Sequence, residues 1–233
     1  MKPLLRLCLV IALTLGCAAD MHSQRKYNKF KSVSIGAKGG ITMSKVTVRP
    51  SVREKYLLGM NLGASVRYIE EKYFGIIGEV NFTQYGWSED FSKETSGSYS
   101  YSHTMNYITV PFLSHIFFGN EPVRGFLNLG PQVGFLLSDK VSTNFDVDNR
   151  PEFTSILETQ QYHEPIKSKF DYGIAGGIGI ELKLKKHSII VEGRYYFGLN
   201  DFFENSKGKA AYFSASAHQQ IWAGVSYLFH FKK

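Results

Sequence analysis

The sequence predicts an all-β fold, an eight-stranded antiparallel up-and-down transmembrane β-barrel, and three observations lead to this prediction. Eight segments alternate apolar and polar residues with a period of two, the pattern of a strand with two different faces. The connections between these segments alternate between short and long, as in outer-membrane barrels. Aromatic residues make up 15% of the 233 residues and 22 residues are glycine, a combination that favours sheets with tight turns over a helical bundle.

The N-terminal segment, residues 1–24, has the features of a secretory signal peptide. Lys2 and Arg6 supply positive charge, and the apolar run at 7–19 is too short to span a bilayer as a helix. Small residues follow the run, so cleavage is expected between residues 19 and 24. This segment predicts export to the bacterial outer membrane.

Both cysteines of the chain, Cys8 and Cys17, lie in this segment. Residues 25–233 are expected to form the barrel domain and contain no thiol, which excludes a disulfide framework, a cysteine–zinc site and a cysteine nucleophile. The alternative is a lipoprotein acylated at Cys17, although Thr14 then stands where leucine is preferred.

The first four strands are predicted within residues 32–43, 57–68, 74–83 and 107–118. The positions between their apolar residues are rich in glycine, serine, threonine and asparagine, so each strand has one apolar and one polar face. The apolar positions are Val33, Ile35, Ala37, Ile41 and Met43; Leu58, Met60, Leu62, Ala64, Val66 and Tyr68; Phe74, Ile76, Val80 and Phe82; and Ile108, Val110, Phe112, Ile116 and Phe118. Pro111 removes a hydrogen-bond donor inside the fourth strand, so a local β-bulge is expected there.

The last four strands are predicted within residues 127–137, 170–183, 189–200 and 220–231. Their apolar positions are Leu127, Leu129, Val133, Phe135 and Leu137; Phe170, Tyr172, Ile174, Ile178, Ile180 and Leu182; Ile189, Val191, Tyr195, Phe197 and Leu199; and Ile221, Ala223, Val225, Tyr227, Phe229 and Phe231. Each of the eight strands is long enough to cross a bilayer at a tilt.

The connections predict which ends of the strands share a side of the membrane. Short connections are expected near 70–72, 119–123 and 185–188, and long ones through 45–56, 88–100, 139–165 and 201–216. Because short turns of outer-membrane barrels face the periplasm and the strand number is even, we expect both termini on the periplasmic side.

A soluble, lipocalin-like barrel with its apolar face inward is the alternative fold. The polar face is rich in glycine, which suits the crowded interior of a small barrel better than a surface in water. Aromatic residues also flank both ends of the apolar face: Tyr68, Phe74, Phe118, Phe229 and Phe231 near the short turns, and Phe82, Phe135, Phe170, Tyr172 and Phe197 near the long loops. Two such girdles favour the membrane barrel, because they mark where a lipid-facing band meets the headgroups.

Several short stretches, in order, resemble the PorT-like outer-membrane β-barrel family. They are GAKGGIT (36–42), GEVNFTQYGW (78–87), YITVP (107–111), LNLGPQVGFLL (127–137), YGIAGGIGIEL (172–182) and GRYYFGLNDF (193–202). The resemblance covers most of the mature chain and implies an eight-stranded barrel in the outer membrane. The founding member is linked to type IX secretion, most members have no assigned role, and the family defines no catalytic residues.

The motifs for metals and cofactors are incomplete. Asn144, Asp146 and Asp148 begin like a calcium loop, but Asn149 replaces the required glycine and Ser155 the bidentate glutamate. The glycines of 173–179 lie in a predicted strand with no helix after it, unlike a nucleotide-binding loop. The seven histidines are scattered and form no His-x-x-x-His pair. We expect no metal site and no cofactor.

Six charged residues are expected to point into the lumen and pair across strands. They are Arg67, Glu79, Glu181, Lys183, Glu192 and Arg194. With a turn centred near 187–188, Glu181 would lie opposite Arg194, and Lys183 opposite Glu192. The alternative is that several of these charges meet lumenal water.

Two kinds of functional residue are considered at the long-loop end. The aromatic side chains near the second long loop could contact a partner or glycan, or simply pack in the loop; they are Tyr85, Trp87, Phe91, Tyr99 and Tyr101. Polar rim residues could instead form a hydrolase site, although nothing in their spacing requires it; they are Glu89, Asp90, His103, Asp201, Glu204, Ser214, Ser216 and His218. We expect no catalytic residues and no enzyme activity.

The sequence therefore favours a structural or accessory outer-membrane barrel that contacts partners through its long loops, with a link to secretion implied by the resemblance. Expected partners are outer-membrane lipid and lipopolysaccharide, the barrel-assembly machinery, and an envelope or secretion protein. Scattered basic residues without interleaved aromatics argue against nucleic acid. The alternatives are a barrel that passes small solutes or binds a ligand, and an outer-rim hydrolase; an eight-stranded interior disfavours a wide pore.

Overall fold

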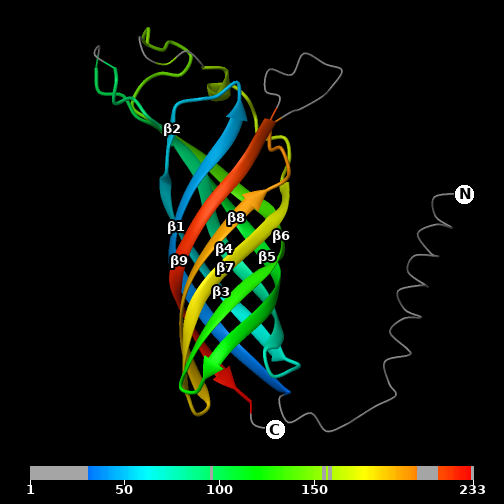
Figure 1. Cartoon of the computed structure of the whole chain (residues 1–233). Coiled ribbons are helices and arrows are strands. Elements are labelled where there is room, and N and C mark those ends of the chain that lie inside the picture. Colours follow the sequence, from blue (N-terminus) through cyan, green and yellow to red (C-terminus); the bar gives the residue numbers. More distant parts are fainter. Residues whose placement is uncertain (1–30, 95–96, 154–155, 157–158, 204–214, 232–233) are drawn as a thin grey trace, which may run out of the picture.

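The computed structural model describes residues 31–94, 97–153, 156, 159–203 and 215–231 (Figure 1). The predicted signal segment lies outside these residues. The strands are β1 Ser32–Arg49, β2 Glu54–Lys55, β3 Leu57–Ile69, β4 Phe74–Glu89, β5 Tyr101–Asn120, β6 Val123–Thr143, β7 Phe170–Leu184, β8 His187–Gly198 and β9 Ala215–His230. A short 3₁₀ helix, η2 (Gln160–Tyr162), lies between β6 and β7. None of the helical segments in the described part of the chain is long and apolar enough to span a membrane.

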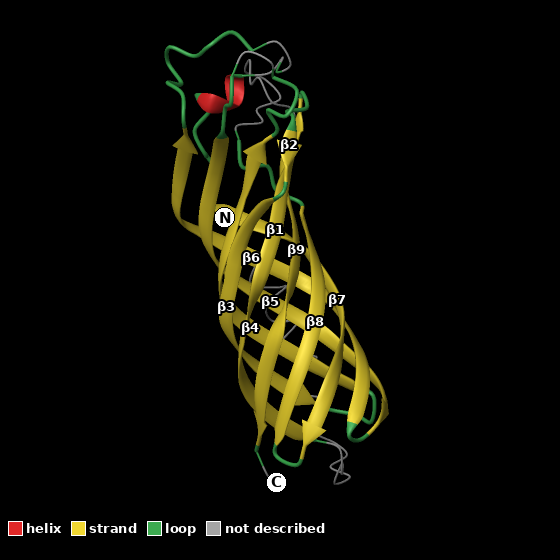
Figure 2. Cartoon of the chain, turned by 90° about the vertical axis from the view of Figure 1, so that its left-hand side faces the viewer, coloured by secondary structure: helices red, strands yellow, loops and turns green. Residues whose placement is uncertain are grey.

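Eight of these strands close into a ring (Figure 2). Each pairs antiparallel with its neighbours in the chain, and β9 returns to pair with β1, so the ring has no free edge. β2 is a two-residue addition beside the far end of β4. The predicted eight-stranded antiparallel up-and-down barrel is confirmed.

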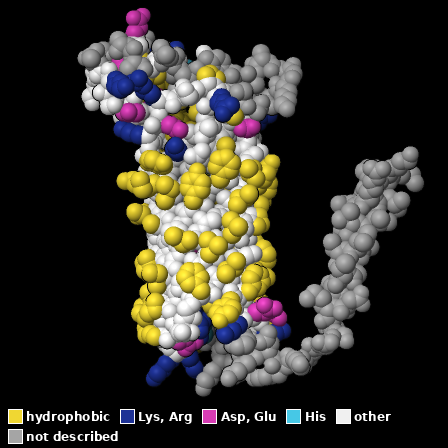
Figure 3. Space-filling model, viewed as in Figure 1, with side chains coloured by type: hydrophobic (Ala, Val, Ile, Leu, Met, Phe, Trp, Pro, Cys, Tyr) yellow, Lys and Arg dark blue, Asp and Glu magenta, His cyan; other side chains and the backbone are white. Residues whose placement is uncertain are grey.

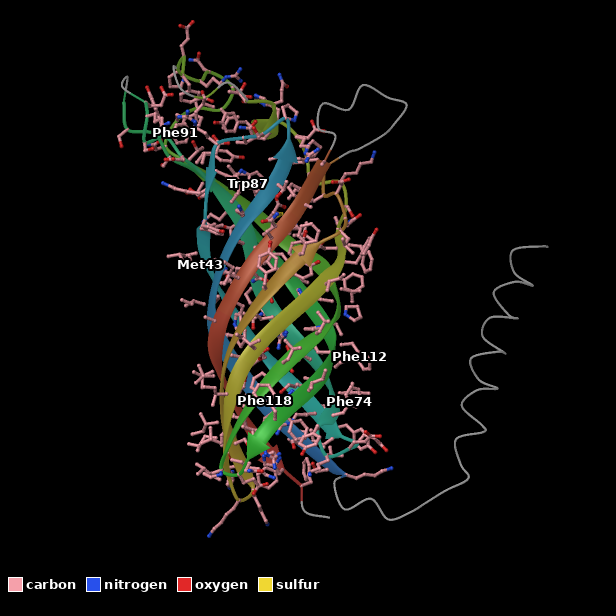
Figure 4. All side chains as sticks on the ribbon, in the orientation of Figure 1. Met43, Phe74, Trp87, Phe91, Phe112 and Phe118 are labelled. Atoms are coloured by element: carbon pink, nitrogen blue, oxygen red, sulfur yellow. The ribbon has the colours of Figure 1, made fainter. Side chains whose placement is uncertain are left out.

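The outer face of the barrel is apolar. Figure 3 shows apolar side chains over the middle of the barrel and charged side chains gathered towards its two ends. Phe112 is 57% exposed, and in Figure 4 the labelled Phe74 and Phe112 point away from the barrel. A soluble barrel would bury these side chains, so the lipocalin-like alternative is excluded.

Several strands are longer than predicted, and most of the extra length lies at the long-loop end. β1 continues to Arg49, β5 begins at Tyr101 and β6 continues to Thr143. At the other end the connections are tight, for example Glu121–Pro122 and Lys185–Lys186. All three short connections therefore lie at one end of the barrel.

Pro111 causes no bulge, so that prediction is wrong. It lies opposite Gln132 in the regular β5–β6 register, and the irregularity between these strands falls at Asn106/Tyr107. On the other side, the β4–β5 pairing is interrupted between Gly78↔Phe112 and Asn81↔Thr109 and resumes in the same register. The β5–β6 pairing is likewise interrupted between Pro111↔Gln132 and Ser114↔Leu129 and resumes in the same register, so the strand passes Pro111 with gaps in its ladders rather than with an extra residue.

Candidate functional site: the barrel interior and its two mouths

A group of charged side chains lies in the half of the lumen nearer the short turns. We define the charge cluster as Lys38, Arg67, Glu79, Glu181, Glu192 and Arg194, which come from β1, β3, β4, β7 and β8. Each is at most 7% exposed. Three cations face three carboxylates, so the cluster is formally neutral, as a narrow interior requires if the charges are to be buried at acceptable cost.

Arg194 lies at the centre of the larger part of this cluster. Its Nη1 and Nη2 donate to the two carboxylate oxygens of Glu79 at 2.8 and 2.9 Å. Its Nε and Nη2 also donate to Glu192 Oε1 at 3.0 and 2.8 Å. Lys38 Nζ donates to Glu79 Oε2 at 2.9 Å. Paired, forked contacts of this kind are the strong class of charge-assisted hydrogen bond.

Arg67 and Glu181 form a second bidentate pair across the lumen. Nη1 and Nη2 of Arg67 donate to Glu181 at 2.9 and 2.7 Å. Neutral polar groups complete the interior: Asn128 Nδ2 donates to Glu192 Oε1 at 2.9 Å, and its Oδ1 lies 2.7 Å from His115 Nδ1. Because a carboxylate only accepts, these contacts orient the Asn128 amide, and His115 Nδ1–H is then the donor to Asn128.

The expected pairing along the β7–β8 hairpin is wrong. Glu181 lies opposite Ile190, not Arg194, and Lys183 lies opposite Ser188, not Glu192. The turn consists of two residues, Lys185–Lys186, so the register differs by four residues from one centred at 187–188. Lys185 reaches this tight turn by adopting a φ of 56°.

Lys38 occupies the place in the charge cluster that was expected for Lys183. Lys183 lies at the short-turn mouth, where its Nζ donates to Glu121 at 2.6 Å. Lys38 takes its place in the charge cluster, with the remaining five predicted residues. Its inward position in a predicted strand was a visible signal, but period-two alternation alone does not show which inward charge has a partner.

Aromatic side chains fill the other half of the lumen. We define the aromatic core as Tyr85, Trp87, Tyr101, Tyr107, Tyr196, Phe202 and Phe203, each at most 3% exposed. Tyr85 stacks on Tyr196 at 5.9 Å, and Trp87 stacks on Phe202 at 5.8 Å. The hydroxyl of Tyr196 donates to Asp171 Oδ2 at 2.8 Å, so a buried polar end is satisfied.

The aromatic residues proposed for partner recognition are packing residues in this structure. Tyr85, Trp87, Phe91 and Tyr101 are buried, and Tyr99 packs against Phe91 at 6.0 Å. Figure 4 shows Trp87 and Phe91 at the long-loop end. Of the two alternatives considered for these side chains, the structure shows packing, because loop residues 145 and 153 supply phenylalanines that cover this site.

Glu89, at the end of β4, is buried beneath the loop that contains η2. Its carboxylate accepts hydrogen bonds from Gln161 Nε2 at 2.8 Å and from the hydroxyl of Tyr162. Burial raises the pKa of Glu89 to about 7, an effect that the two hydrogen bonds oppose. The loop is therefore anchored on a carboxyl group that titrates near neutral pH.

The residues proposed for a rim hydrolase make other contacts. Ser216 Oγ accepts from the backbone N–H of Phe203 at 2.9 Å. Asp201 accepts from the backbone N–H of Ser216. The ring of His218 stacks on Phe202 at 4.6 Å and is buried.

The other rim candidates are similarly occupied or lie elsewhere. His103 Nε2 lies 2.9 Å from Asp139, and its ring packs on Trp87 at 4.7 Å. Asp90 accepts from the backbone of Ser92 at 3.0 Å. Glu204 and Ser214 lie outside the described residues. Within the described part of the chain, no three His, Cys, Asp or Glu residues are grouped as a metal site would require.

Two cavities interrupt the filling of the lumen. One, of about 460 Å³, opens at the short-turn mouth of the barrel, and the Arg67–Glu181 pair is part of its lining. The other, of about 10 Å³, lies between the charge cluster and the aromatic core and is lined by Lys38, Asn81, Gln220 and Trp222 among others. The second has room for about one water molecule.

A family model and several solved structures are similar to this chain. A family model described as outer membrane protein beta-barrel domain matches residues 19–204. No curated protein matches the chain. Similar solved structures include Ail of Yersinia pestis with the heparin analogue sucrose octasulfate (18% identity, 84% of this chain and 99% of that one, TM-score 0.41). Another is OprG of Pseudomonas aeruginosa (10% identity, 87% and 98% coverage, TM-score 0.47).

The family match spans most of the chain, including seven of the eight barrel strands. The part of the barrel that it covers has the apolar exterior and the polar or aromatic interior described above. This chain belongs to the outer membrane protein beta-barrel domain family and is an outer-membrane β-barrel protein.

Proposed function

We propose that this protein is a non-conducting accessory barrel that binds an envelope partner through its long-loop end and carries out no catalysis. The observation that carries the proposal is the filled lumen. Buried, paired charges occupy one half and packed aromatic rings the other. The cavity between them, about 10 Å³, has no room for a solute larger than water.

The long-loop end supports the binding role. β1, β5 and β6 extend beyond the apolar band, and the connections between strands pack on the aromatic core. A loop surface held by a buried core is pre-organised, which lowers the entropy lost when a partner binds. Lipid and lipopolysaccharide are expected to contact the apolar outer face and its upper rim.

The resemblance to the PorT-like family makes type IX secretion the first process to test. Deletion of the gene should reduce export of a type IX cargo if the accessory role lies there, and re-expression should restore it. Normal export in the deletion strain would separate this protein from that system while leaving its barrel role intact.

Conductance separates the accessory barrel from a solute channel. In planar bilayers the refolded protein should produce no stable conductance steps, whereas a known porin in the same bilayers provides the positive control. Reproducible steps would overturn the non-conducting proposal.

A photo-crosslinker in intact cells tests the binding role. Placed at Asp148, which is 90% exposed in a long loop, it should capture a discrete partner. The matched site is Lys186 in the short β7–β8 turn, which should not capture that partner. Capture of the same partner from Lys186 would place binding at the short-turn end and contradict the proposal.

An unbiased hydrolase screen of the refolded protein tests the absence of catalysis. Hydrolysis of any substrate in the screen would contradict it.

A further inference from the structure

The cavity at the short-turn mouth has the size and chemistry of a ligand site. Its volume of about 460 Å³ is within the range of small-ligand pockets. Strands β3, β5, β6 and β7 and two short turns contribute to its walls. The Arg67–Glu181 pair, His115 and Phe117 lie on these walls, together with Arg124 and Lys183. The cavity is separate from the long loops to which the proposed function is assigned.

The walls are electropositive. Five cationic side chains, from Lys31, Arg67, Lys72, Arg124 and Lys183, lie on the walls with three carboxylates, and a fourth carboxylate, Glu70, pairs with Lys31 at 3.0 Å, which leaves an excess of one positive charge. One carboxylate is used twice, because Glu121 Oε1 accepts from Lys183 at 2.6 Å and from Arg124 at 2.8 Å. A wall with this excess attracts an anion, and its own carboxylates disfavour a dense dianion more than a monoanion.

Three buried nitrogen atoms on these walls have no hydrogen-bond partner among the described residues. They are Nε of Arg67, Nε of Arg124 and Nε2 of His115. The two guanidinium N–H groups are donors. Because His115 Nδ1–H donates to Asn128, the Nε2 atom of the neutral ring is an acceptor. A complementary ligand must therefore offer acceptor oxygens and an N–H group together.

We propose that this cavity binds an acidic peptide segment of a periplasmic protein, through a carboxylate and a neighbouring amide N–H. A peptide supplies both groups, and the methylene groups of its acidic side chain can pack on Phe117 and Tyr73. Lipid tails contact the outer face of the ring, whereas this cavity lies inside the ring of strands. The chain's own residues 25–29, RKYNK, are basic and have the wrong charge for this site.

The test uses the full mature barrel refolded in nanodiscs of zwitterionic lipid. N-acetyl-Asp-Asp is titrated while the ring signals of His115 are followed by NMR, and affinity is measured by calorimetry. We expect a saturable shift of the His115 signals. The double variant Lys72→Gln/Arg124→Gln should bind N-acetyl-Asp-Asp at least about tenfold more weakly than the wild-type protein, because it removes two cations from the cavity wall.

The matched control removes the same charge from the same end of the barrel, outside this cavity. Lys185→Gln/Lys186→Gln should alter the affinity by no more than about twofold. These two side chains do not line the cavity, and salt in the solvent screens their charges from a ligand bound there. Heat-modifiable migration on a gel checks that both variants fold. Equal losses in the two double variants would show general rim electrostatics and overturn the proposal.

Three other probes distinguish the sources of an anion on the wild-type protein, independently of any variant. The neutral peptide N-acetyl-Asn-Asn-amide should not shift the His115 signals. Inorganic phosphate should bind more weakly than the acidic peptide. Nanodiscs containing phosphatidylglycerol should leave the signals in place. Binding of the neutral peptide, equal binding of phosphate, a shift caused only by the anionic lipid, or no saturation at millimolar N-acetyl-Asp-Asp would each overturn the proposal.

Discussion

The two halves of the lumen are filled with opposite chemistry, although the same strands run through both. In the half nearer the short turns, the inward side chains are the paired charges and a small buried apolar cluster of Ile69, Phe117, Phe126, Ile190 and Leu228, and the outward ones are apolar. At the long-loop end, inward Tyr85 and Tyr107 are buried rings. On the outer side next to them, Gln84 Nε2 donates to Asn106 Oδ1 at 3.1 Å, and Asn106 Nδ2 donates to Ser138 Oγ at 3.0 Å.

The inside-out arrangement therefore holds only along the apolar band. Where the exterior faces lipid, polar residues can be placed only inside, and there they must satisfy one another. Where the strands leave the band, the exterior is polar and the interior becomes an ordinary apolar core. The two halves should accordingly fail in different ways when they are altered.

The largest expected effect is all-or-none and tests which end of the barrel faces the outside of the cell. A cysteine introduced at Asp148 should react with an impermeant thiol reagent on whole cells, and one at Lys186 should react only after the outer membrane is opened. Both positions lie in described turns or loops, at opposite ends of the barrel. The reverse labelling pattern would invert the assignment of the two halves.

Removing Arg194 should have the largest energetic effect. Arg194→Ala leaves Glu79 and Glu192 without their guanidinium, which should lower the free energy of unfolding by about 4 kcal/mol. In Arg194→Ala/Glu79→Gln the cluster regains its charge balance, so the loss should be smaller than the sum of the single losses. Urea unfolding of the refolded barrel measures this, with Lys186→Ala as the exposed control. Additive losses would contradict the coupled pair.

Truncating Trp87 should weaken the long-loop half by packing alone. Trp87→Ala should cost about 3 kcal/mol, because it opens a cavity against Phe202 and Phe203. We expect faster proteolysis of the long loops while the barrel keeps its heat-modifiable migration. If Arg194→Ala and Trp87→Ala gave the same proteolysis pattern, the two halves would not be independent.

The smallest effect is a pH dependence confined to the long-loop half. Since the pKa of Glu89 is raised to about 7 in the folded state, that state binds the proton more tightly than the unfolded chain. Stability from this group is complete below about pH 4.5 and is lost as pH rises through about 7. Hydrogen exchange of residues 159–163 should accelerate over that interval.

Glu89→Gln is the control for this pH dependence, because glutamine keeps the shape and cannot ionise. Its exchange rates at 159–163, corrected for the intrinsic pH effect, should be flat between pH 5 and 8. A pH dependence that persists in Glu89→Gln would assign it to another group.

Much of the fold follows from local sequence pattern. Alternation at period two identified all eight barrel strands and which side chains face lipid, because a strand's two faces are set by the backbone itself. The same pattern could not find where β5 and β6 end, since their outer faces become polar before the pairing stops. It also misplaced the bulge, because a missing N–H can be absorbed by gaps in the ladders that leave the register unchanged.

The sequence by itself determined which residues are inward, which are outward, and that residues 25–233 contain no thiol. Only the tertiary structure decided which inward charges meet. Arg67 and Glu181 are 114 residues apart, and Arg194 and Glu79 are 115 apart. Such pairs depend on barrel closure and on the register of every hairpin, and one two-residue turn at Lys185–Lys186 is enough to change the partners. Alternation is a property of one strand, whereas pairing across a lumen is a property of the closed ring.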